Sequence, residues 1–93
     1  MIPLDEKQKR SEAHNVLIRY RSLRRIRSND ELDKINSAVK KLSEIEKTII
    51  NRKYIQIDEW NNIKISTSMF ISESSFYRKL NKALAHFHEI YFN

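Results

Sequence analysis

The chain of 93 residues contains no cysteine and no glycine, and its only proline is Pro3. Without cysteine it cannot form disulfides, thiolate metal sites or a cysteine nucleophile, which suits a reducing, cytoplasmic compartment. Without glycine it lacks the usual phosphate-binding loop. No apolar run approaches the roughly 20 residues of a membrane span, and the charged N-terminal segment lacks the apolar stretch of a signal peptide. We therefore expect a mostly helical protein that does not enter a membrane.

Positive charge is what the chain has in excess. Its 18 Lys and Arg residues outnumber 12 Asp and Glu residues, which leaves a formal net charge of +6 at pH 7. Both ends of the chain are basic and the middle third is neutral. Such a balance favours a polyanionic partner, nucleic acid above all. The length fits one domain.

The N-terminal segment predicts a basic amphipathic helix from about Asp5 to Arg25. Its apolar positions recur at spacings of three and four, the stripe of a helix that packs on one side: Ala13, Val16, Tyr20 and Leu23. A polar stretch at residues 27–30 then separates a helical arm, residues 1–29, from a helix-turn-helix domain, residues 30–93, within one compact unit.

The end of this arm is rich in arginine and holds no acid between residues 19 and 27. Such a cluster can bind phosphates, follow a minor groove or dock on an acidic protein surface, and the plainer alternative is a basic helix face in solvent. Arg27 falls within the apolar stripe, so we expect the helix to end there. The candidate contacts with DNA are Arg19, Arg21, Arg24 and Arg25.

Two capping boxes predict the next helices. Ser28 with Glu31 and Ser43 with Glu46 have the spacing at which a side chain and a backbone amide satisfy each other. The helix that begins at the Ser43 box should reach about Tyr54, and residues 55–62 are predicted to form a connecting loop.

The C-terminal third predicts a short helix capped by Asn61 or Asn62, a turn at residues 69–71, and a longer helix that Ser72 caps. The inner face of the long helix carries Phe76, Leu80, Ala83, Leu84, Phe87 and Tyr91, and the opposite face carries Ser74, Arg78, Asn81, Lys82 and Ala85. A short helix, a turn and a longer helix with a polar outer face is the order of a helix-turn-helix unit.

That outer face has the side chains that a major groove requires. Arg78 can donate to both acceptors of guanine, Asn81 can pair with adenine, and Ser74 and Ser75 can reach base edges or phosphates. On the flanks, Tyr77, Lys79 and Lys82 suit phosphate contacts. An ordinary solvated helix face is the alternative.

Patterns for catalysis or metal binding are weak. His86 and His88 are two residues apart, so they lie on different sides of a helix and cannot form the i, i+4 pair of a helical metal site. Adjacent carboxylates at Asp58 and Glu59 are poor evidence for acid and base catalysis. We expect no enzyme, no metal and no cofactor.

Two segments resemble known regulators. Residues 42–54, LSEIEKTIINRKY, are similar to the entry of sigma-factor region 4, and residues 71–84, ISESSFYRKLNKAL, resemble the recognition helix of ArpU and RinA-like phage regulators. Those regulators usually have glycine where Phe70 stands, so this turn must close without a residue that easily takes a positive φ. Residues 61–68 match the first helix of the motif poorly.

The resemblance implies an all-α domain of four to five helices with a sigma region 4-like helix-turn-helix, and Ser74, Ser75, Tyr77 and Arg78 as groove-facing residues. It also implies a phage activator of late packaging and lysis genes that binds double-stranded DNA at the bacterial nucleoid. Host RNA polymerase, a second copy of the chain and an inhibitor protein from a mobile element are further partners to test.

The alternative to a specific regulator is a nonspecific DNA-binding accessory protein or a protein-interaction adaptor. The adaptor would use the apolar stripe of the arm together with an apolar C-terminal group: Phe87, Ile90, Tyr91 and Phe92. Exposed apolar patches of that kind mark interfaces.

Overall fold

A computed structural model describes residues 5–26, 29–56, 58 and 60–93. All regular secondary structure in these residues is helical, which confirms the all-α prediction. When α1 is taken with α2, and α4 with the π-helix η1 that continues it, there are five helical segments. The bounds are α1 Glu6–Ile18, α2 Tyr20–Ile26, α3 Asn29–Lys40, α4 Glu44–Ile50, η1 Asn51–Ile55, α5 Asn62–Ser68 and α6 Glu73–Tyr91.

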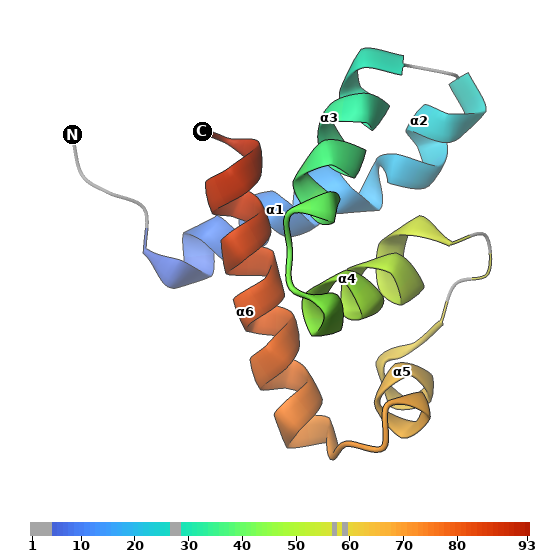
Figure 1. Cartoon of the computed structure of the whole chain (residues 1–93), viewed down its shortest axis with the longest axis vertical. Coiled ribbons are helices and arrows are strands. Elements are labelled where there is room, and N and C mark those ends of the chain that lie inside the picture. Colours follow the sequence, from blue (N-terminus) through green and yellow to red (C-terminus); the bar gives the residue numbers. More distant parts are fainter. Residues whose placement is uncertain (1–4, 27–28, 57, 59) are drawn as a thin grey trace.

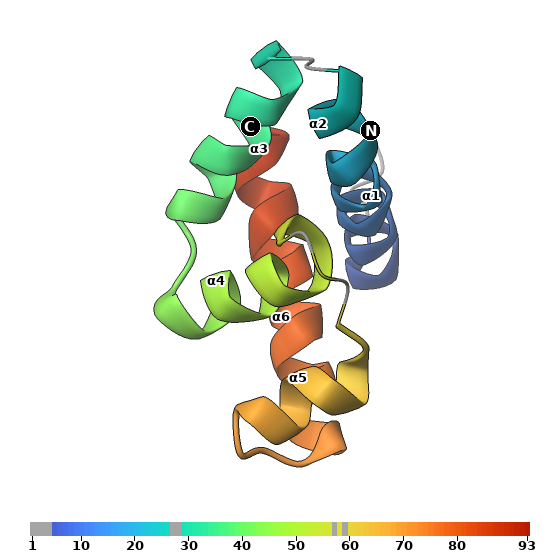
Figure 2. The ribbon, with the colours of Figure 1, turned by 90° about the vertical axis from the view of Figure 1, so that its right-hand side faces the viewer.

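Helix α6 is the central element of the fold. It runs through most of the height of the molecule, and α1, α3, α4 and α5 all contact it (Figures 1 and 2). Fully buried side chains come from five of the helices, so one core serves the whole described chain: Leu17, Ile35, Ile49, Ile50, Ile65, Phe76 and Phe87. None of the helices in the described ranges is both long and apolar enough to cross a membrane.

The predicted inner face of α6 is confirmed, but its buried arc is wider than the apolar stripe. Ala85, which the sequence placed on the polar outer face, is only 8% exposed, so that assignment was wrong. Helices α1 and α4 both contact α6, and Figures 1 and 2 show them on different sides of it, so together they cover more of its surface than one neighbour would. His88 is also buried, with Nε2 3.5 Å from Glu12 Oε1 of α1.

The N-terminal helix is broken where the sequence predicted a continuous one. Arg19 separates α1 from α2, and its amide donates to the carbonyl of Val16 instead of continuing the regular ladder. The break lets α2 pack beside α3 and η1 while α1 stays against α6.

The apolar residues assigned to an adaptor surface are mostly inside the molecule. Ala13, Val16, Tyr20 and Leu23 are buried, and so are Phe87 and Tyr91. Ile90 is half-buried and Phe92 is about half exposed. The predicted exposure is therefore wrong for the six buried residues, which belong to the core, while Phe92 is exposed as predicted.

The capping box at the start of α4 is confirmed. The amide of Ser43 donates to Glu46 Oε1 at 3.1 Å, and the amide of Glu46 donates to Ser43 Oγ at 3.3 Å. The other predicted box depends on Ser28, which lies outside the described residues, as does Arg27. The predicted third helix is confirmed as α4 and η1 together.

Glu46 also joins α4 to α6, and this contact predicts a pH dependence of stability. Burial raises the pKa of Glu46, but hydrogen bonds from the Ser43 amide and the His86 ring outweigh it, so the pKa is lowered overall. His86 Nδ1 lies 2.5 Å from Glu46 Oε2. A carboxyl group with a lowered folded pKa stabilises the fold above its unfolded pKa, and this stabilisation is lost as the pH falls through the folded pKa.

We therefore expect Glu46→Gln to flatten the decline of unfolding free energy below about pH 4.5, the region in which glutamate titrates. Urea denaturation at a series of pH values measures this decline. Glu44→Gln is the matched control, since Glu44 is exposed on the same helix and contacts only Lys47 through its carboxylate. Equal pH slopes for wild type and Glu46→Gln would show that this carboxylate does not control acid stability.

Candidate nucleic-acid interface

The predicted helix, turn and helix are present at the C-terminal end, as α5, the connection Met69–Ser72 and α6. Asn61 Oδ1 accepts from the amide of Lys64 at 2.7 Å, which caps α5. Ser72 Oγ accepts from the amide of Ser75 at 3.1 Å, which caps α6. Both predicted caps are confirmed, and they fix where each helix starts.

Phe70 closes the turn in the left-handed region, with φ of 58°. Its amide donates to the carbonyl of Thr67, and the amide of Ile71 donates to the carbonyl of Ser66, both at 3.1 Å. This pair of bonds is a Schellman motif, which requires a positive φ at the position that Phe70 fills. For a residue with a Cβ atom, that conformation costs about 1–2 kcal/mol.

We expect Phe70→Gly to raise the free energy of unfolding, by about 1 kcal/mol or less, because glycine takes a positive φ freely but gains backbone entropy in the unfolded chain. Urea denaturation measures the change. Ile63→Gly is the control, since it places glycine in α5 at an exposed helical position and should cost about 1 kcal/mol. A loss of stability in Phe70→Gly would mean that the ring supports the turn.

The candidate residues on α6 gather on one exposed half of the helix. Ser74, Tyr77, Arg78, Asn81 and Lys82 are exposed, and Ser75 and Lys79 are half-buried. A shallow cavity of about 300 Å³ lies among Ser75, Arg78, Lys79 and Lys82. Arg78 Nη2 donates to Ser75 Oγ at 3.3 Å, so the guanidinium lies along the helix surface. The face presents cations and short hydroxyls.

A second surface cavity of about 310 Å³ adjoins the first and shares Lys79 and Lys82 with it. Its other walls come from the start of α4 and from His86. The Glu46 carboxylate in this cavity is paired with His86, so it does not stand alone beside the lysines. This cavity therefore joins the Lys79 and Lys82 side of α6 to the N-terminus of α4.

The arginines of the arm lie elsewhere. Figures 1 and 2 both place α2 at the upper end of the molecule and the start of α6 at the lower end, so the structure does not bring the two sets together. Arg19 pairs with Glu31 at 2.9 Å. Arg25 is exposed and has no hydrogen bond or ion pair with another described residue.

Two of these arginines bind the end of η1. Arg21 Nη2 donates to the carbonyls of Gln56 at 3.1 Å and Lys53 at 3.5 Å, and Arg24 Nη1 donates to the carbonyl of Ile55 at 3.2 Å. Carbonyls at a helix end have no partners within the helix, and a guanidinium satisfies them well. Arg21, which the sequence suggested as a DNA contact, is half-buried and donates to these carbonyls.

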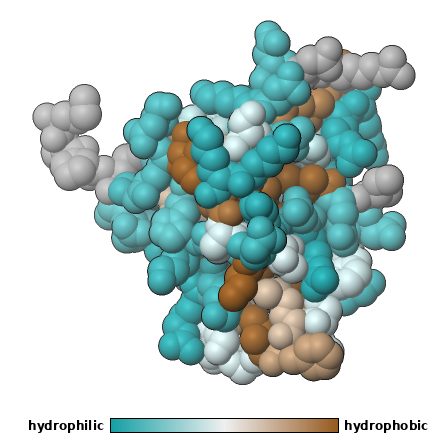
Figure 3. Space-filling view, viewed as in Figure 1, coloured by the Kyte–Doolittle hydropathy of each residue, from teal (hydrophilic) through white to brown (hydrophobic). Residues whose placement is uncertain are grey.

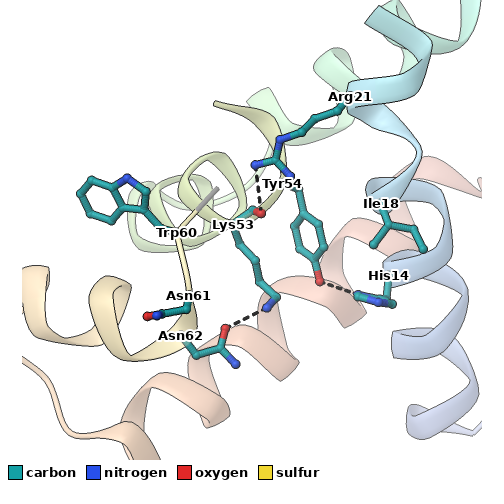
Figure 4. Close-up of a pocket in the computed structure, with 8 residues that line it drawn as sticks. All are labelled: His14, Ile18, Arg21, Lys53, Tyr54, Trp60, Asn61 and Asn62. Atoms are coloured by element: carbon teal, nitrogen blue, oxygen red, sulfur yellow. Dashed lines mark hydrogen bonds between the residues drawn. The ribbon is translucent and has the colours of Figure 1, made fainter. Parts of the chain in front are cut away.

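A polar cavity of about 540 Å³ lies between α1, η1 and the start of α5 (Figure 4). On one wall, His14 Nδ1 lies 2.8 Å from the Tyr54 hydroxyl. On the other, Lys53 Nζ donates to Asn62 Oδ1 at 2.8 Å, and Asn62 Nδ2 donates to the Tyr77 hydroxyl at 3.2 Å. This chain of hydrogen bonds connects η1, the start of α5 and the outer face of α6.

The electrostatics of this cavity keep its aromatic groups neutral. Partial burial and the Lys53 cation lower the pKa of His14, and burial raises the pKa of the Tyr54 hydroxyl. No group of three or more potential metal ligands occurs among the residues that the structure describes. Beside this cavity, the hydrogen bond from Lys53 to Asn62 links η1 to the start of α5.

Sequence reasoning missed two residues of this interface. Asn62 was considered only as a cap, yet its amide joins Lys53 to Tyr77. Phe70 stands where the similar regulators usually have glycine, and this difference was the only feature of the sequence that pointed to it.

Comparisons with known proteins leave the family open. No family model matches the chain, and neither a curated protein nor a solved structure is similar enough to it to count as a match. The resemblance to ArpU and RinA-like regulators therefore stays a prediction that depends on residues 42–54 and 71–84.

Proposed function

We propose that this protein binds double-stranded DNA at specific sequences and regulates transcription, with the N-terminal half of α6 in the major groove. One observation supports this most strongly: the candidate base-reading and phosphate-binding side chains share one exposed half of the helix that follows a capped turn. The net charge of +6 adds an attraction for DNA.

The proposed contacts divide into two kinds. Arg78 and Asn81 read base edges, while Lys79 and Lys82 neutralise phosphates beside the groove. Activation of phage late genes at the nucleoid, with contact to host RNA polymerase, depends on the sequence resemblance alone. The arginines of the arm have a secondary role in this proposal, and Arg19, Arg24 and Arg25 are exposed.

Capture of genomic DNA tests the proposal. Sheared host and phage DNA is incubated with the purified protein at physiological salt, and the retained fragments are sequenced. A sharp peak upstream of an operon supports a site-specific regulator, and its position shows which genes are controlled. Diffuse retention that salt abolishes would instead support a nonspecific DNA-binding accessory protein.

On the retained site, Arg78→Ala is expected to weaken binding by about 1 to 3 kcal/mol and to relax specificity at one base pair. Lys82→Ala is expected to weaken binding to all sequences alike and to reduce the slope of log K against log salt concentration by about 1. Fluorescence anisotropy with labelled duplexes at several salt concentrations measures both effects.

Lys40→Ala is the matched control for charge, because Lys40 is exposed at the end of α3 and belongs to neither surface cavity on α6. If all three variants bound DNA as the wild type does, α6 would not be the groove-reading helix. A loss of binding confined to Lys40→Ala would move the interface to α3.

A further inference from the structure

Phe70 is the most exposed large hydrophobic residue in the described chain. Its side chain is 95% exposed, against 62% for Ile63 and 49% for Phe92. Figure 3 shows a mostly hydrophilic surface with scattered hydrophobic patches, one of which is at its lower end, over the region of α5 and the start of α6. Isolated exposed apolar residues are common, so exposure alone carries no conclusion.

The backbone of Phe70 adds an independent observation. Its φ of 58° is costly for a residue with a Cβ atom, and glycine or asparagine would close the same turn at less cost. An exposed fraction of 95% leaves the ring almost no contact with the rest of the fold to offset that cost. The fold does not need a phenyl ring here, and an unsupported backbone outlier of this kind motivates a hypothesis of function.

The position of the ring indicates the partner. Phe70 lies in the connection that leads into α6, immediately before the turn of helix that carries Ser74 and Arg78. A helix that enters the groove at its N-terminus brings this connection to the DNA surface as well. The first turn of α6 carries one carboxylate, Glu73, and the cations Arg78, Lys79 and Lys82 follow it. The cations outnumber the acid, so this end of the molecule attracts a polyanion.

We propose that the Phe70 ring packs against DNA at the edge of the groove that α6 enters, as an apolar contact that adds to affinity. This inference depends on the proposed function, because it needs α6 to bind DNA. The ring contacts the apolar edge of a base or a deoxyribose, and it neutralises no phosphate. Its contribution is therefore the same at every salt concentration, unlike that of Lys82.

The test uses the full chain and the duplex retained in the genomic capture. Phe70→Asn removes the ring and keeps a residue that tolerates a positive φ, while Phe70→Tyr keeps the ring. Phe92→Asn is the matched control, since Phe92 lies just beyond the other end of α6 and is half exposed. Urea denaturation of each variant accompanies anisotropy over a range of salt.

We expect Phe70→Asn to bind about fivefold more weakly, the equivalent of about 1 kcal/mol, with an unchanged salt slope and no loss of stability. Phe70→Tyr and Phe92→Asn should bind as the wild type does. A loss of affinity without a loss of stability distinguishes a contact with DNA from a role in the turn.

Wild-type affinity in Phe70→Asn, while Arg78→Ala binds weakly, would overturn this inference and leave the proposed function intact. A changed salt slope in Phe70→Asn would also overturn it, because the ring would then act through charged neighbours. If the wild type retains no DNA, the proposed function fails, and the Phe70 inference is rejected with it.

Discussion

Replacing Phe76 by alanine is expected to lower the free energy of unfolding by about 3 to 5 kcal/mol. The side chain is fully buried on the inner face of α6, and removing the ring leaves a cavity in the shared core. Domains of this size have a total stability of about 5 to 15 kcal/mol, so the variant should be partly unfolded near body temperature. Urea denaturation followed by circular dichroism measures the change.

The comparison between Phe76 and Arg78 separates the two faces of α6. Phe76→Ala should lower both the free energy of unfolding and the affinity for DNA. Arg78→Ala should lower only the affinity for DNA, with the free energy of unfolding unchanged within about 0.5 kcal/mol. A cost below about 1 kcal/mol in Phe76→Ala would mean that the core is loosely packed around α6. The exposed half of α6 would then not be held rigidly by the core beneath it.

The helices with local signals could be predicted from the sequence. The 3.6-residue period of α6 is long and regular, and the caps at Ser43, Asn61 and Ser72 act over three residues, so neighbouring positions determine them. The same locality explains why the exposed half of α6 could be predicted while Ala85 could not. Burial of Ala85 depends on which helices pack on either side of α6.

Long-range partners could not be predicted from spacing. Arg21 and Arg24 looked like solvent-exposed cations, but their partners are carbonyls at Lys53, Ile55 and Gln56, which lie about 30 residues later in the chain. Only the folded chain brings these groups together, and the break at Arg19 makes the approach possible. A dense basic cluster is therefore a weak indication of DNA contacts when a helix end lies within reach.

The candidate site was predictable in its side chains and not in its backbone. Ser74, Arg78 and Lys82 are exposed as the sequence suggested. The left-handed conformation of Phe70 was not evident, because nothing local to a phenylalanine predicts a positive φ. It accompanies the two hydrogen bonds that the backbone amides of Phe70 and Ile71 donate at the end of α5.

Leu17→Ala is expected to cost about 2 to 5 kcal/mol and to shift the unfolding of the entire chain. Leu17 is fully buried in α1, which contacts both α6 and η1. The division into an arm, residues 1–29, and a helix-turn-helix domain, residues 30–93, stays a prediction, and this variant tests it. The only tryptophan, Trp60, belongs to the second part, so its fluorescence follows that part during urea denaturation.

If the core is shared, the urea midpoint from Trp60 fluorescence should fall together with the midpoint from circular dichroism, since one cooperative transition has one midpoint. Ile18→Ala is the matched control, because Ile18 is the next residue of α1, is 53% exposed, and should cost far less. An unchanged Trp60 midpoint in Leu17→Ala would mean that the arm unfolds separately. The helix-turn-helix would then be an independent unit, and the arginines of the arm would be free to move toward DNA.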